Sequence, residues 1–251
     1  MSEEQIQTAL GAAVAVAVVS DTSIDRQKSL ASETSREVLQ SVERSEDRAM
    51  EAKLQRMSEH IAGANNLGGD WTVYLLNDGT PNAMTPGGGD IFVNTGLIAF
   101  TETEAQMAMI LAHEMAHSHE GHVVENIRDS TLIGIAAVLL GERLGGDAQQ
   151  IGVELGTSAV LAGYSRGAER EADDLGFEYL VRAGYHPAEA AKPFLRFDAA
   201  FGSTDNLSHF FTGTHPHSKD RAASMAAKAA QVEARGIANT AEFSQLTAKY
   251  R

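Results

Sequence analysis

Apolar residues recur with helical spacing over most of the chain. Between about Ser23 and Ala64 they repeat every three or four positions, as at Met50, Leu54, Met57 and Ile61, with charged residues between them. Similar patterns predict helices over 101–129, from Ser165 to about Gly184, after Pro187 and after Asp220. The chain is therefore expected to be mostly helical.

Three short stretches have the residue preferences of strands instead. They lie at 71–76, 82–85 and 91–94, and turn signals separate them at Asn77-Asp78-Gly79 and at Pro86-Gly87-Gly88-Gly89. Three short strands with tight turns predict a small, antiparallel sheet beside the helices. The fold class expected is α+β.

Two apolar runs in 131–163, joined by a Gly-rich link, are each shorter than the roughly 18 apolar residues of a membrane-spanning helix. A buried or lid-like helical hairpin is expected there, with peripheral membrane contact as a further role. The apolar run at 10–19 is also too short to span and follows Glu3 and Glu4, whereas a signal peptide has Lys or Arg there. It is expected to belong to the folded protein, or to the mature N-terminus of an exported protein.

The formal net charge of −14 argues against a nucleic-acid partner. The absence of cysteine excludes disulfides, thiolate nucleophiles and Cys-ligated zinc. It leaves the redox compartment open.

The strongest chemical signal is His113-Glu114-Met115-Ala116-His117, an HExxH motif within a helical, apolar stretch. Residues four apart lie on one face of a helix, so His113 and His117 can bind one Zn²⁺, with Glu114 placed to deprotonate a water. The alternative is a surface helix with two solvated histidines. A metzincin would need Gly at 120 and His at 123, where the chain has Glu120 and Val123. His119 and His122 are therefore expected to be supporting or structural residues rather than ligands.

A third ligand is expected on the helix that follows Ser165. Glu171, Asp174, Glu178 and Arg182 form a charged stripe that should face water, whereas Glu169 and Asp173 share a face with Gly176 and Leu180. An inward carboxylate needs a partner, and a metal ion suffices. Glu169 is therefore the candidate ligand, with Asp173 accepting the free N–H of a ligating histidine. An inward Glu–Arg salt bridge is the alternative.

Two further segments are candidate parts of the site. The stretch that begins with Asn82, Ala83 and Met84 is short and flanked by proline, so it is either an edge strand that pairs with extended substrate or an ordinary hairpin strand. His215 lies in a Gly- and Pro-rich loop, and Arg221 follows six residues later. The two residues are expected either to hold an oxyanion or to have a purely structural role.

The order of these motifs resembles the gluzincin metallopeptidases of the HtpX, BepA, OMA-type and CAAX prenyl protease kind, over about residues 70–225. The resemblance rests on Asn82-Ala83-Met84, the run from Gly89 to Ile98, the HExxH motif, Ser165-Arg166 with Glu169 to Asp173, and Thr214-His215-Pro216 with Arg221. It implies a zincin-like core, one Zn²⁺ held by His113, His117 and Glu169, Glu114 as general base and Asp173 in support.

The resemblance also implies a metalloendopeptidase acting on unfolded or misassembled proteins in envelope quality control. The residues at 1–64, 70–225 and 226–251 are expected to be an N-terminal helical segment, the zincin-like core and C-terminal helices of one domain. A periplasmic or otherwise exported location is expected, with the cytoplasm as the alternative. Two other functions remain open: a chaperone-like zinc protein, and a latent protease in which the His215 loop closes the fourth metal position. The oligomeric state is not indicated.

Overall fold

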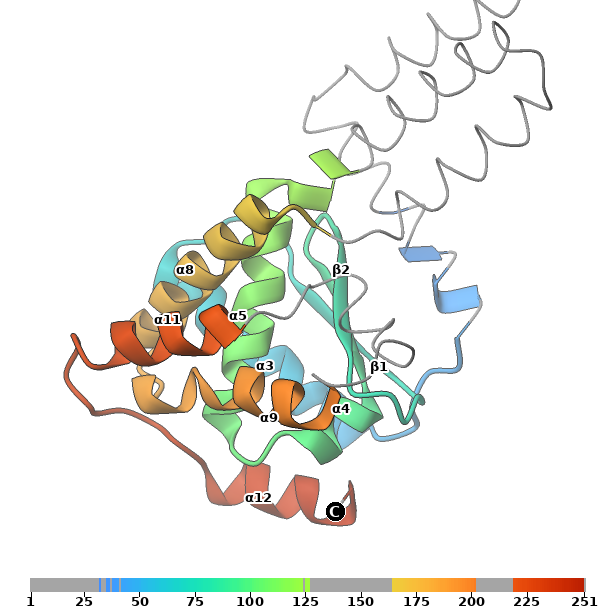
Figure 1. Cartoon of the computed structure of the whole chain (residues 1–251). Helices are drawn as coiled ribbons and strands as arrows, with labels where there is room; N and C mark the ends of the chain where they lie inside the picture. Colours follow the sequence, from blue (N-terminus) through green and yellow to red (C-terminus); the bar gives the residue numbers. More distant parts are fainter. Residues whose placement is uncertain are drawn as a thin grey trace, which may run out of the picture.

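The computed structural model describes residues 42–123, 125–126, 164–201 and 219–250, with isolated positions between 32 and 40. In chain order its helices, 3-10 turns and strands are α3 (Arg48–Asn65), β1 (Thr72–Leu76), β2 (Ala83–Gly87), β3 (Asp90–Asn94), α4 (Thr95–Phe100), α5 (Glu104–Glu120), α8 (Arg166–Arg182), η1 (Pro187–Glu189), α9 (Lys192–Phe201), α11 (Lys219–Ala229), α12 (Ala241–Thr247) and η2 (Ala248–Tyr250). Helices pack against a three-stranded sheet, which confirms the α+β class (Figure 1). None of the helices in these ranges is both long and apolar enough to cross a bilayer.

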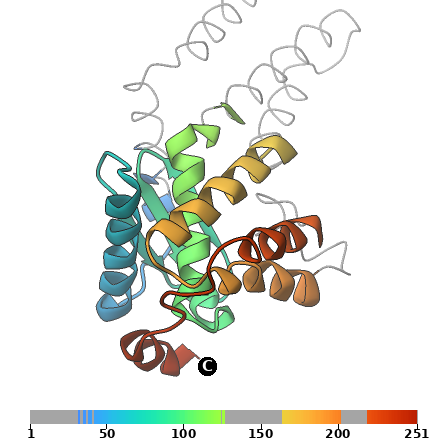
Figure 2. The ribbon, with the colours of Figure 1, turned by 90° about the vertical axis from the view of Figure 1, so that its left-hand side faces the viewer.

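Helix α5 lies at the centre of the molecule. Every residue from Glu104 to His117 is buried, so the helix is enclosed on all sides rather than along one stripe. The sheet packs on one side of α5 and α8 packs on the other, and α3 contacts the sheet, α5 and α8 (Figures 1 and 2). The polar side chains of the HExxH motif are therefore held inside the protein.

The sheet has the strand order β1-β3-β2, with β1 parallel and β2 antiparallel to β3. The prediction of an antiparallel sheet was right for β2–β3 and wrong for β1–β3. The chain turns at Asp78 but does not form a hairpin there, because the Asp78 carbonyl accepts hydrogen bonds from the Gly96 N–H and the Thr95 hydroxyl. The connection after β1 therefore leads to β2 at the opposite edge of the sheet, and β3 then lies between β1 and β2.

Two helix boundaries differ from those expected. Helix α5 begins after Thr103, whose side chain accepts a hydrogen bond from the Gln106 N–H, and it ends at Gly121 with φ 74°. The expected cap, Thr101, instead donates its hydroxyl to the carbonyl of Leu97 at the end of α4. Helix α3 begins after Asp47, so the helix expected from about residue 23 is interrupted by the non-helical residues 42–47.

Candidate metal centre

Helix α8 presents its carboxylates on two opposite faces, as the sequence predicted. Glu169 and Asp173 are only 4% and 3% exposed, whereas Glu171, Asp174 and Glu178 are exposed. The helix begins after Ser165, whose side chain caps the Ala168 N–H. This register points the two buried carboxylates at α5.

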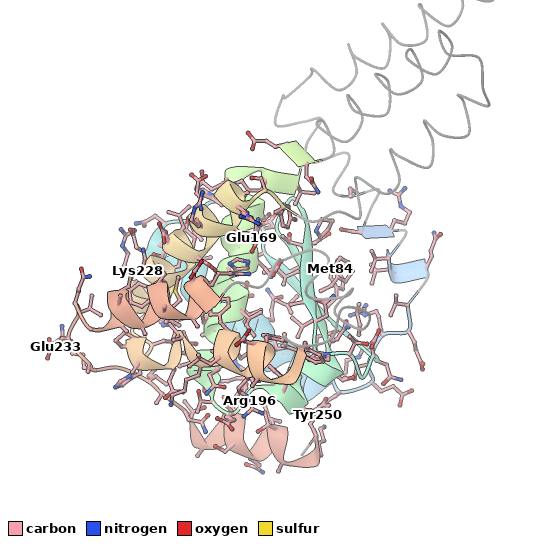
Figure 3. All side chains as sticks on the ribbon, in the orientation of Figure 1. Met84, Glu169, Arg196, Lys228, Glu233 and Tyr250 are labelled. Carbon is pink, nitrogen blue, oxygen red and sulfur yellow. The ribbon has the colours of Figure 1, made fainter. Side chains whose placement is uncertain are left out.

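The buried face brings together His113 and His117 from α5 and Glu169 from α8. Figure 3 labels Glu169 on α8. The Nε2 atoms of the two histidines lie 3.1 Å apart. Glu169 Oε2 lies 3.7 Å from His113 Nε2, and Glu169 Oε1 lies 3.4 Å from His117 Nε2. A tetrahedral zinc ion with bonds of about 2.0–2.1 Å separates its ligand atoms by about 3.3 Å. The donor set and its spacing therefore fit zinc.

Asp173 and Arg221 lie beside this donor set: Asp173 faces Nδ1 of His113, and Arg221 Nη2 lies 3.4 Å from Nε2 of the same ring. Asp173 Oδ1 lies 3.1 Å from His113 Nδ1. Arg221 donates two hydrogen bonds of 2.7 Å to the Asp173 carboxylate, and its Nη1 lies 2.9 Å from Glu169 Oε2. The guanidinium also lies over the Phe194 ring, 4.6 Å from its centre. Arg221 thus binds both acidic residues of the buried α8 face.

These contacts keep both members of the buried pair charged. Burial raises the pKa of Asp173, but hydrogen bonds from His113 and Arg221 outweigh burial and leave that pKa below its ordinary value. Burial lowers the pKa of Arg221, but its bonds to Asp173 and the nearby carboxylates leave its pKa raised. A charged Asp173 accepts the Nδ1 proton of His113, which leaves Nε2 with a lone pair for a metal.

Glu114 and Tyr164 complete the described part of the site. Glu114 is fully buried next to the first histidine of the motif. The Tyr164 ring stacks on His117 with 3.9 Å between ring centres. Burial raises the pKa of the Tyr164 phenol, and the negative charges of Glu114 and Glu169 raise it further. Tyr164 was not predicted from the sequence, where its only signal is an aromatic residue directly before the N-cap of α8.

The other candidate residues are placed less completely. His215 and the hairpin at 131–163 lie outside the described residues, so their expected roles stay predictions. Arg221 lies at the site, and its expected role in holding an oxyanion also stays a prediction. Ala83 and Met84 lie on β2, and Asn82 directly precedes it. Among the described strands β2 is at an edge of the sheet, which is one of the two alternatives, and its pairing with substrate stays a prediction. Figure 3 labels Met84 on the opposite side of α5 from α8.

Comparison with known proteins agrees with this geometry. The family model "Peptidase family M48" matches residues 45–229. The chain is 32% identical over 161 residues to the mitochondrial metalloendopeptidase OMA1 of Schizosaccharomyces pombe, covering 64% of this chain and 47% of that protein. It is 28% identical over 145 residues to the beta-barrel assembly-enhancing protease of Yersinia pestis, covering 54% of this chain and 30% of that protein.

The chain spans less than half the length of these curated relatives. The matched region contains both histidines of the HExxH motif, Glu169 and Arg221. The family model covers well over half of the 251 residues. The chain therefore belongs to peptidase family M48.

Proposed function

We propose that this chain is a zinc-dependent metalloendopeptidase that hydrolyses peptide bonds in protein substrates. The observation that carries the proposal is the convergence of three buried donor atoms at zinc-like separations, with a buried glutamate directly beside the first. Membership of a peptidase family and similarity to a metalloendopeptidase support it.

Different residues of the chain bind the metal, transfer protons and position the ligands during hydrolysis. His113, His117 and Glu169 hold the zinc ion, which supplies Lewis acidity toward water and the scissile carbonyl. Glu114 takes a proton from the attacking water and delivers it to the leaving amine nitrogen. Asp173 fixes the proton of His113 on Nδ1, and Arg221 holds Asp173 in place.

The edge strand β2 is proposed to bind substrate in extended form. The Asn82 carbonyl accepts the Asn94 N–H at 3.0 Å, so the backbone groups of the next residue, Ala83, point away from β3. Ala83 is only 1% exposed, so a substrate strand would pair there after displacing the groups that cover it. Ala83→Pro removes that N–H and should raise KM for a peptide substrate while zinc content stays unchanged. An unaltered KM would argue against this binding mode.

The role of Glu114 is tested by Glu114→Gln, with Glu120→Gln on the same helix as the control because Glu120 is exposed. Removing a general base typically slows the reaction by about 10²–10⁴-fold. We expect Glu114→Gln to keep its zinc and lose cleavage of casein by at least this factor, while the control cleaves normally. Casein cleavage by Glu114→Gln at the wild-type rate would refute the role.

For the biological setting, we propose periplasmic protein quality control in the cell envelope. The similarity to proteases named for enhancing β-barrel assembly supports this setting. If it is correct, cell fractionation will find the chain in the periplasm, and its loss will raise the level of misassembled envelope proteins. Recovery of the protein in the cytoplasm would contradict the proposal.

A further inference from the structure

His122 lies directly after the residue that ends α5 and turns back toward His117. Gly121 adopts φ 74°, a left-handed conformation that allows the chain to reverse at the end of the helix. His122 is 4% exposed, and its Nδ1 lies 3.0 Å from Nδ1 of His117. Its other ring nitrogen, Nε2, lies 3.4 Å from Oε2 of Glu171.

These contacts define the positions of the ring protons once His117 binds a metal. His117 directs Nε2 at His113 and Glu169, so this nitrogen must carry the lone pair and the proton must lie on Nδ1. That proton can be donated to His122 only if Nδ1 of His122 is unprotonated. The proton of a neutral His122 then lies on Nε2, which faces Glu171.

The two ligating histidines are therefore supported by different groups. His113 contacts the buried carboxylate of Asp173, whereas His117 contacts a second imidazole. The Tyr164 ring, stacked on His117, prevents the imidazole from tilting away from that contact. Removing a hydrogen-bond partner of this kind typically weakens metal binding by about 10–100-fold.

We propose that His122 is a positioning residue for the metal centre: it accepts the Nδ1 proton of His117 and thereby fixes the tautomer and orientation in which His117 binds zinc. Glu171 fixes the complementary tautomer of His122. The inference rests on the proposed zinc site, and it adds a residue that binds neither the metal nor the substrate.

The test measures zinc affinity of the metal-free chain by competition with a chromophoric chelator. In His122→Asn the amide oxygen takes the place of Nδ1 and can accept the proton, whereas His122→Leu has no acceptor. We expect zinc to bind about 10–100-fold more weakly to His122→Leu, and His122→Asn to recover most of the loss. His119→Leu is the matched control, because His119 is an exposed histidine of the same segment, and it should bind zinc as the wild type does.

The possible outcomes separate the two proposals. If the wild type binds no zinc, the metal site itself fails. If the wild type binds zinc and His122→Leu binds it equally well, or if His122→Asn is as weak as His122→Leu, only the positioning role fails.

Nitrogen-15 NMR of the zinc-loaded wild type provides a readout that does not depend on any variant folding. We expect a proton on Nδ1 of His117 and an unprotonated Nδ1 on His122. A neutral His122 with its proton on Nδ1 would overturn the proposal.

Discussion

Gly176 lies where α8 comes close to the backbone of α5, the other helix that carries candidate metal ligands, and it limits the distance between the two helices. A Cβ atom at this position would lie 3.1 Å from both the N and the Cα atoms of His113, and 3.2 Å from Cε of Met109. Two of these contacts are with backbone, so neither atom can move aside alone. Gly176→Ala should therefore push α8 away from α5 by a few tenths of an ångström.

A displacement of that size matters more to the metal site than to the fold. Overpacking lowers the free energy of unfolding by about 1–3 kcal/mol. Replacing glycine by alanine within a helix raises it by about 1 kcal/mol. We therefore expect the metal-free variant to lose about 0–2 kcal/mol of unfolding free energy. Ligand distances in metal sites tolerate only about 0.2 Å. Glu169 moves with α8 and His113 stays on α5, so zinc affinity should fall about tenfold, or about 1.4 kcal/mol.

The assay compares Gly176→Ala with Gly167→Ala, which lies in the first turn of the same helix. At Gly167 the added Cβ meets only Ser165 Oγ at 3.6 Å, an ordinary contact. Zinc affinity is measured by chelator competition, and stability by urea unfolding in EDTA. Gly167→Ala should match the wild type in zinc affinity. If Gly176→Ala also binds zinc as tightly as the wild type, the close approach of the helices does not set the ligand geometry.

Two further predictions concern charges. Arg221→Met leaves the buried carboxylates Asp173 and Glu169 without their cation, so urea unfolding in EDTA should show a loss of about 3–5 kcal/mol; a loss below about 1 kcal/mol would show that the ion pair is dispensable. Burial raises the pKa of Asp47, but hydrogen bonds, notably with Lys249, leave it below its ordinary 3.8. Because the folded pKa is the lower one, this stabilisation is complete above the unfolded pKa and is lost as pH falls below about 4. Asp47→Asn should therefore flatten the acid limb of the stability curve, and an unchanged limb would contradict this.

The buried and exposed faces of α8 were predictable from sequence because side chains in every α-helix repeat with the same spacing. Once residues repeat every 3.6 positions, an all-charged stripe must face solvent, and the opposite face must be buried. This placed Glu169 and Asp173 correctly before any contact was known. The spacing of His113 and His117 likewise required only a helix.

The sheet topology was not predictable from the same local signals. A turn at Asn77-Asp78-Gly79 is compatible with a hairpin or with a crossover, and contacts with Thr95 and Gly96 decide between them. The start of α5 was similarly ambiguous, since Thr101 and Thr103 both have capping side chains. Such choices depend on residues distant in sequence.

The contacts around the candidate ligands also depended on tertiary structure. That His122 touches His117 follows from the reversal at Gly121, and the stacking of Tyr164 follows from how α8 approaches α5. The bidentate bond from Arg221 to Asp173 joins α11 to α8. A sequence pattern shows which face of a helix is buried, but it does not show which other element packs against that face.

The most direct test of the metal centre is the zinc content of purified protein, measured by metal analysis for the wild type, Glu169→Ala and Glu178→Ala. Glu178 is an exposed glutamate on the same helix, so its variant controls for loss of charge. We expect about one zinc per chain in the wild type and in Glu178→Ala, and a content well below that in Glu169→Ala. A full zinc ion per chain retained by Glu169→Ala would contradict the assignment of Glu169 as the third ligand.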